Sequence, residues 1–114
     1  NVDWRLLKAI SIVESRLNPT ALNTRDPSYG LMQIYCKPLR HTCSNKFNIE
    51  SWPPKHYNYL FDIDYNVKIG SQILAWNIKT FGFVMGITRY NNYRATRPTR
   101  YTNTVLTEYR RLLQ

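Results

Sequence analysis

Glu14 is a carboxylate on a segment whose other positions predict a buried helix face. It follows Leu7 by seven residues and Ile10 by four, so on a helix it projects from the rim of the apolar face that these residues form. Partial burial disfavours the charged form of a carboxyl group, so such a Glu can stay protonated near neutral pH and act as a general acid. The competing interpretation is the commoner one for a lone helical Glu: it turns to solvent or accepts a hydrogen bond from Ser15 or Arg16.

Three short segments of the chain fit together in order and spacing. They are Glu14-Ser15-Arg16-Leu17-Asn18-Pro19, Ser28-Tyr29-Gly30-Leu31-Met32-Gln33-Ile34 and Arg89-Tyr90-Asn91. This ordered set resembles the three signature segments of lytic transglycosylases, the goose-lysozyme-like muramidases that cleave bacterial peptidoglycan. The run from Leu60 through Asn66 to Leu74 looks like the helix entry between the second and third segments of that family. The resemblance therefore covers nearly the whole chain.

The resemblance implies a role for each residue that would touch the substrate or the acid. Glu14 would be the sole acid and base, and Tyr90 would donate a hydrogen bond that orients it. The side chains of Met32 and Gln33 would lie in the groove against the sugar. Gln33 interrupts an apolar run, and its amide needs partners, which a sugar N-acetyl group or the protein backbone could supply equally well.

Two further residues match the family pattern, while several others depart from it, among them Tyr35-Cys36, which stands where a proline-containing turn is usual. The resemblance implies that Ser15 and Asn91 support the helix and the loop that hold the acid and its tyrosine. Arg89 stands where a small residue usually precedes Tyr-Asn, and Asn92 replaces a frequent glycine. We therefore expect contacts beside the groove to differ from those usual in the family.

The implied chemistry needs one carboxylate. Ordinary glycosidases use two, one to protonate the leaving oxygen and one to activate water or attack the sugar. The other carboxylates in the middle of the chain are Asp26, Glu50, Asp62 and Asp64, and none has a neighbouring motif. In the lytic transglycosylase reaction the C6 hydroxyl of N-acetylmuramic acid attacks, so one residue serves both steps and the product is a 1,6-anhydro sugar. A hydrolytic lysozyme resembling the goose type, with water as the attacking group, is the alternative.

The first predicted helix carries Glu14. Asp3 can cap this helix, which we expect to end at Asn18 because Pro19 follows. A turn at Asp26-Pro27 then leads to the run 30–34, whose composition alone predicts a short core helix.

The second predicted helix is the central, most buried one. Asp62 or Asp64 can cap it, and Gly82 is placed to end it. Gly70 interrupts it at a cost of about 1 kcal/mol relative to Ala, which suggests that another backbone passes close by. A merely tolerated glycine is the alternative.

The remaining segments complete a mainly α architecture. Residues 35–59 read as an irregular excursion, and a polar loop at 91–100 leads to a last helix for which Thr102 is the expected cap. No strand alternation or internal repeat appears. We predict a lysozyme-like helical domain with four to six helices and irregular loops around a substrate groove, spanning residues 1–114 as a single domain.

Cys36 and Cys43 are the two cysteines of the chain. A disulfide between them would add about 2.5 kcal/mol of stability in the chain-entropy model and would suit an oxidising compartment. Zinc held by Cys36, His41, Cys43 and His56 is the competing interpretation, ranked behind two unpaired thiols. It lacks both a Cys-x-x-Cys and a closely spaced His pair. We therefore expect no metal and no cofactor.

The composition of the chain limits the classes of molecule that it can bind. The 114 residues, 43 % of them hydrophobic, suit one domain, and 16 Lys and Arg against seven Asp and Glu give a net charge of +9. Such a surface favours polyanions, and a 14 % aromatic content excludes a disordered basic tail. A non-enzymatic nucleic-acid-binding domain could use Arg94, Arg97 and Arg100, with Tyr93 and Tyr101 for stacking. That alternative leaves Glu14 unexplained, so we expect no nucleic-acid partner.

The setting follows from the substrate that the resemblance implies. The expected partner is the glycan strand of peptidoglycan, and no apolar run is long enough to span a membrane. The chain begins at Asn1, as a mature exported protein or a domain of a longer one would. We expect a bacterial periplasmic or wall-exposed location, or a virion. Small members of the family serve conjugation or secretion complexes or belong to phage particles.

Overall fold

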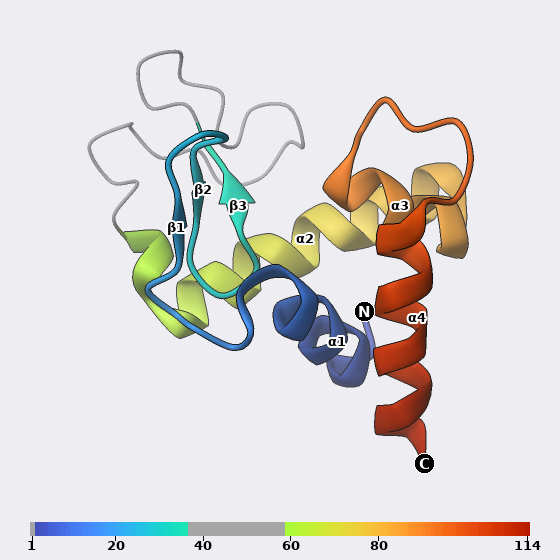
Figure 1. Cartoon of the computed structure of the whole chain (residues 1–114), viewed down its shortest axis with the longest axis horizontal. Coiled ribbons are helices and arrows are strands. Elements are labelled where there is room, and N and C mark those ends of the chain that lie inside the picture. The colour runs from blue at the N-terminus through green and yellow to red at the C-terminus, as the bar shows by residue number, and fades with distance from the viewer. Residues whose placement is uncertain (1, 37–58) are drawn as a thin grey trace.

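The computed structural model describes residues 2–36 and 59–114 and shows four helices beside a very small sheet (Figure 1). The helices are α1 (Trp4–Ser15), α2 (Ile63–Phe81), α3 (Phe83–Asn91) and α4 (Arg100–Leu113). The strands are β1 (Leu22–Asn23), β2 (Ser28–Tyr29) and β3 (Ile34–Tyr35). The prediction of a mainly α, lysozyme-like domain is confirmed. The expected irregular excursion falls mostly on residues 37–58, outside the described residues.

Helix α1 begins where the sequence predicts and ends three residues early. Asp3 caps it through a side-chain oxygen that accepts from a backbone amide of the first turn. Arg16 and Leu17 then take left-handed backbone conformations with φ of 54° and 63°, and their amides donate to α1 carbonyls. This local motif closes the helix before the expected end at Asn18. Glu14 therefore lies in the last turn of α1.

Residues 30–34 form a turn and the start of a strand, so the prediction of a short helix there is wrong. Gly30 and Gln33 have left-handed φ values of 77° and 51°, which a right-handed helix excludes. The three strands pair antiparallel in the order β1-β2-β3, with Tyr29 opposite Leu22 on one side and Ile34 on the other. Strands of two residues are too short for an alternating pattern to appear in the sequence.

Asn66 of α2 fixes this turn through three hydrogen bonds. Its side chain is fully buried, its Oδ1 accepts from the Met32 amide at 2.8 Å, and its Nδ2 donates to the carbonyls of Tyr29 and Leu60, each at 2.8 Å. A Cβ at Gly30 would overlap the Leu60 carbonyl and the Asn66 amide. Both the positive φ and the lack of space therefore require glycine at position 30.

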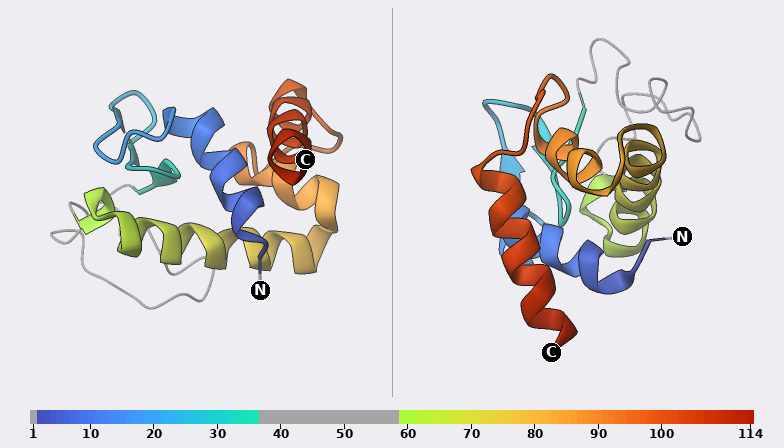
Figure 2. Two further views of the ribbon diagram at one scale, coloured as in Figure 1. Left: turned by 90° about the horizontal axis from the view of Figure 1, so that it is seen from below. Right: turned by 90° about the vertical axis from the view of Figure 1, so that its right-hand side faces the viewer.

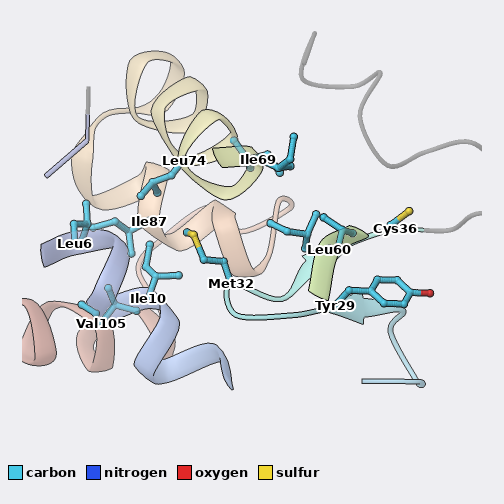
Figure 3. Packing of buried hydrophobic residues seen from close by; sticks show 13 residues of the cluster. Leu6, Ile10, Tyr29, Met32, Cys36, Leu60, Ile69, Leu74, Ile87 and Val105 are labelled. Atoms are coloured by element: carbon cyan, nitrogen blue, oxygen red, sulfur yellow. The ribbon is translucent and has the colours of Figure 1, made fainter. Parts of the chain in front are cut away.

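The core joins all four helices to the turn before β3 (Figure 3). Its largest fully buried apolar side chains are Leu6, Ile10, Met32, Ile34, Leu60, Ile69, Leu74, Ile87 and Val105. Met32 packs against Gly70 of α2, where any Cβ would overlap the Met32 side chain. The close approach predicted at Gly70 is therefore real, but a side chain makes it rather than a backbone.

The ends of α2 and α4 show which caps the sequence identified. Asp62 caps α2 and Gly82, with φ of 88°, ends it, as predicted. Thr99 caps α4, whereas the expected cap was Thr102, three residues later. Thr102 instead completes a capping box with Thr99, and its hydroxyl lies 2.6 Å from that of Thr88 in α3.

Helix α1 packs against both α2 and α4, as two further views show (Figure 2). Tyr109 of α4 donates a hydrogen bond to the Asp3 carboxylate at 2.9 Å, and this bond ties α4 to the start of α1. The first turn of α4 correspondingly lies beside the last turn of α1. Three segments that are far apart in sequence, the end of α1, the end of α3 and the start of α4, therefore meet.

Candidate active site

Glu14 lies where the end of α1 contacts the end of α3 and the start of α4. Its carboxylate is mostly buried, and its Oε2 accepts a hydrogen bond of 2.9 Å from the hydroxyl of Tyr101 in α4. Burial raises the pKa of Glu14 from an ordinary value of 4.5 to about 7, and the Tyr101 hydrogen bond partly opposes that rise by stabilising the carboxylate. The group is therefore divided between acid and carboxylate at neutral pH, the condition under which one residue can both give and take a proton.

Tyr90 of α3 lies close to Glu14 without forming the hydrogen bond that the resemblance implies. Its hydroxyl donates to the Met32 carbonyl at 2.8 Å. Burial raises the pKa of Tyr90 well above its ordinary value, and the negative charge of Glu14 raises it further. Tyr101 thus occupies the orienting position expected for Tyr90, while Tyr90 connects α3 to the turn before β3.

The turn before β3 places Met32 and Gln33 differently. Met32 is fully buried in the core, so its side chain supports the turn rather than lining a groove, contrary to the expectation. Gln33 is partly exposed, and its Nε2 donates to the carbonyls of Ala21 and Gly30 at 3.2 and 3.0 Å. Backbone groups therefore satisfy this amide, which is the second of the two alternatives that the sequence left open.

Ser15 and Asn91 have different surroundings. The Ser15 hydroxyl lies 2.6 Å from the Leu31 carbonyl and 3.1 Å from the Ser11 carbonyl, so it links the end of α1 to the turn before β3. This contact fits the supporting role expected for Ser15. Asn91 is the exposed last residue of α3.

The other carboxylates of the described residues have different surroundings. Asp3 and Asp62 cap helices, and Glu108 forms an ion pair with Arg111 at 3.0 Å. Asp26 and Asp64 are exposed. The raised pKa of Glu14 has burial as its cause, opposed by Tyr101, and no described carboxylate contributes to it. Within the described ranges, Glu14 is therefore the one carboxylate that neither caps a helix, nor forms an ion pair, nor is exposed.

A comparison with protein families identifies the family of this chain. The model of the transglycosylase SLT domain matches residues 1–104, a range that includes Glu14, Tyr90 and Tyr101. The chain belongs to the transglycosylase SLT domain family. Membership indicates a peptidoglycan-cleaving transglycosylase whose substrate lies outside the cytoplasm. Neither the curated proteins nor the solved structures give a significant match.

Tyr101 is the residue of this candidate site that the sequence patterns of the SLT domain do not single out. The sequence suggests Tyr101 only as a stacking residue of the nucleic-acid alternative, because no motif surrounds it. It lies 87 residues from Glu14 along the chain, and only the packing of α4 against α1 brings the two together. A tyrosine in the first turn of the helix after the third family segment is the only signal that the sequence offers.

Other sequence expectations lie away from this centre. Cys36 of the SLT domain is buried and disulfide-bonded, so it has no thiolate to offer zinc and is not an unpaired thiol; Cys43, His41 and His56 lie outside the described residues. Two surface hollows, one between α1, α2 and α4 and one beside Trp4 and Leu31, do not include Glu14. Within residues 2–36 and 59–114, no helix is both long and apolar enough to cross a membrane.

Proposed function

We propose that residues 1–114 form one lytic transglycosylase domain that cuts the β-1,4 bond between N-acetylmuramic acid and N-acetylglucosamine, with Glu14 as the only acid and base. The observation that carries this proposal is a buried carboxyl group with a pKa of about 7, held by a tyrosine hydroxyl. Family membership supplies the substrate, and the local geometry supplies the candidate acid.

In the proposed reaction the carboxyl group of Glu14 first donates a proton and later accepts one. The Glu14 carboxyl first protonates the bridging oxygen, and the bond from that oxygen to C1 of the muramic acid breaks. The N-acetyl group of the substrate stabilises the developing positive charge at C1. The C6 hydroxyl then bonds to C1 and gives its proton to the Glu14 carboxylate, which restores the acid and leaves a 1,6-anhydro sugar.

Tyr101 and Tyr90 support these steps in different ways. The Tyr101 hydroxyl stabilises the carboxylate formed after the first transfer, because it already donates to Oε2. Tyr90 holds the turn before β3 through the Met32 carbonyl, and Ser15 holds the same turn through the Leu31 carbonyl. We propose that this turn forms one side of the substrate groove, with Gln33 at its partly exposed edge, and that Asn91 supports the loop after α3.

Hydrolysis is the second candidate reaction. It would need a group that activates water, and the described carboxylates other than Glu14 are exposed, cap helices or form an ion pair. This distribution favours attack by the C6 hydroxyl. We place the reaction in the periplasm, at the cell wall or in a virion, where a conjugation or secretion complex or a phage particle would use it to open the wall locally.

Mass spectrometry of the muropeptides released from purified peptidoglycan tests the proposal. The native chain should release products that end in 1,6-anhydro-N-acetylmuramic acid, about 18 Da lighter than hydrolytic products through loss of one water. Glu14→Gln should release none while binding strands normally, because only proton transfer is lost. Asp26→Asn, which removes an exposed carboxylate, is the matched control and should cut normally. Reducing ends would show a lysozyme, and normal cutting by Glu14→Gln would refute the assignment of the acid.

A further inference from the structure

Three exposed arginines lie on and next to the connection between α3 and α4. Arg94 and Arg97 belong to the connection itself, and Arg100 is the first residue of α4; all three are exposed. The sequence between Asp64 and Glu108 contains no carboxylate, and Glu108 is paired with Arg111. Within the part of the chain that the structure describes, no ion pair involves any of the three, which we call the arginine platform.

The backbone that carries the arginine platform is fixed. The Asn92 side chain accepts from the Arg94 amide at 3.1 Å, and the Asn92 carbonyl accepts from the Ala95 amide at 3.0 Å. Ala95 is buried, and the capping box of Thr99 and Thr102 secures the end of the connection. The backbone therefore needs no ordering when the exposed side chains bind a ligand, and only the side chains lose freedom.

The arginine platform adjoins the proposed active site. The connection begins after α3, whose Tyr90 lies close to Glu14, and it ends at α4, whose Tyr101 donates to Glu14. It also projects on the same side of the molecule as the turn between β1 and β2 (Figures 1 and 2). Arg89 packs on α2, because its guanidinium lies 4.2 Å from the centre of the Phe81 ring, whereas the Arg94 guanidinium lies 5.5 Å from the ring of its neighbour Tyr93 and stays exposed.

A substrate bound at Glu14 carries negative charge next to the bond that is cut. The muramic acid residue of peptidoglycan bears a short peptide with free carboxylates, whereas the glycan strand itself is uncharged. A planar guanidinium matches a carboxylate with two parallel hydrogen bonds. Exposed arginines beside the proposed active site therefore have a partner within the substrate, and no second macromolecule is needed to account for them.

We infer that Arg94, Arg97 and Arg100 bind the peptide carboxylates of peptidoglycan and make this domain prefer strands that still carry their peptides. The inference rests on the proposed function for the position of the strand over Glu14. It adds a recognition site for the peptide, formed by exposed arginines, to a reaction that otherwise acts on the sugar alone.

Equilibrium binding of soluble glycan strands tests the inference without any cutting, in a Glu14→Gln background checked by circular dichroism. Three ligands are compared: strands with intact peptides, the same strands with their carboxylates converted to neutral amides, and strands freed of peptides. The platform variant is Arg94→Gln/Arg97→Gln/Arg100→Gln. The matched control is Lys8→Gln/Lys79→Gln/Arg110→Gln, which removes three exposed positive charges from α1, from the end of α2 and from the last turn of α4, and lowers the net charge by the same amount.

The platform variant should bind peptide-bearing strands about tenfold more weakly, as expected for three partly screened ion pairs. It should bind the amidated and the peptide-free strands as the background does, and the control should stay within about twofold on all three ligands. Equal weakening in both variants would show a general charge effect and overturn the inference, and so would the absence of any preference in the background protein.

Two outcomes separate this inference from its competitors. If the platform variant loses affinity for double-stranded DNA and keeps its affinity for peptide-bearing strands, the platform is a nucleic-acid surface and the inference is wrong. If the chain with native Glu14 releases no anhydro products while the binding preference depends on the platform, the proposed reaction fails and the peptide site stands.

Discussion

Glu14 should make the folded protein less stable as the pH rises, and Glu14→Gln should remove that effect. The folded carboxyl group, with a pKa of about 7, holds its proton more tightly than the unfolded group, whose ordinary value is 4.5. Between these values the folded chain binds a proton that the unfolded chain has released. The free energy of unfolding therefore falls as the pH rises through this window, because burial disfavours the charged form of this carboxyl group.

The size of the effect follows from the displacement of the pKa. At about 1.36 kcal/mol per pKa unit, the change from 4.5 to about 7 corresponds to about 3 kcal/mol, of which about 2.5 kcal/mol accumulates between pH 5 and pH 8. Gln has nearly the same shape, stays neutral, and keeps an oxygen that can accept from Tyr101. Relative to the native chain, Glu14→Gln should therefore gain about 2.5 kcal/mol in stability over this range.

Urea unfolding at pH 5 and pH 8, followed by tryptophan fluorescence, measures this difference. The native chain and Glu14→Gln are compared at each pH, so the contributions of all other titrating groups cancel. Asp26→Asn controls for the loss of one negative charge and should show no gain over the range. A stability difference between Glu14→Gln and the native chain that is the same at both pH values would refute the burial argument, and with it the basis for Glu14 as a general acid.

Three other perturbations test the contacts around this site. Tyr101→Phe removes the hydrogen bond that stabilises the Glu14 carboxylate, so the alkaline limb of kcat/KM against pH should move up by about one unit. Tyr109→Phe, in the same helix, should leave that limb in place. Asn66→Ala leaves three buried backbone groups without their partner, and urea unfolding should show a loss of about 3 kcal/mol or more; a loss below about 1 kcal/mol would contradict this accounting. The pKa of Asp3 is lowered from 3.8 to about 2, chiefly by its hydrogen bond with the Arg5 side chain. Stability should therefore fall as the pH drops through this range, and thermal unfolding of Asp3→Asn should show a smaller fall.

Elements whose ends depend on local chemistry were predicted well from the sequence. Asp3 and Asp62 cap α1 and α2 with their own side chains, and Gly82 ends α2 because its backbone is left-handed. These interactions join residues within about four positions, so the sequence contains all the partners. The prediction of a helix at 30–34 was wrong because Asn66, more than thirty residues away in the sequence, holds that segment in a turn.

Residue types and spacing alone placed Glu14 on a buried helix face, within an ordered family pattern. They also made it the candidate acid. Only the tertiary structure decided which hydroxyl holds it. The sequence pattern favours Tyr90, but the packing of α3 brings that hydroxyl to the Met32 carbonyl, and the packing of α4 brings Tyr101 to the carboxylate. Met32 belongs to the core for a similar reason, since Gly70 leaves space for its side chain. Local hydrogen bonds and apolar periodicity are properties of a segment, whereas the partner of a buried polar group depends on how segments far apart in the chain pack together.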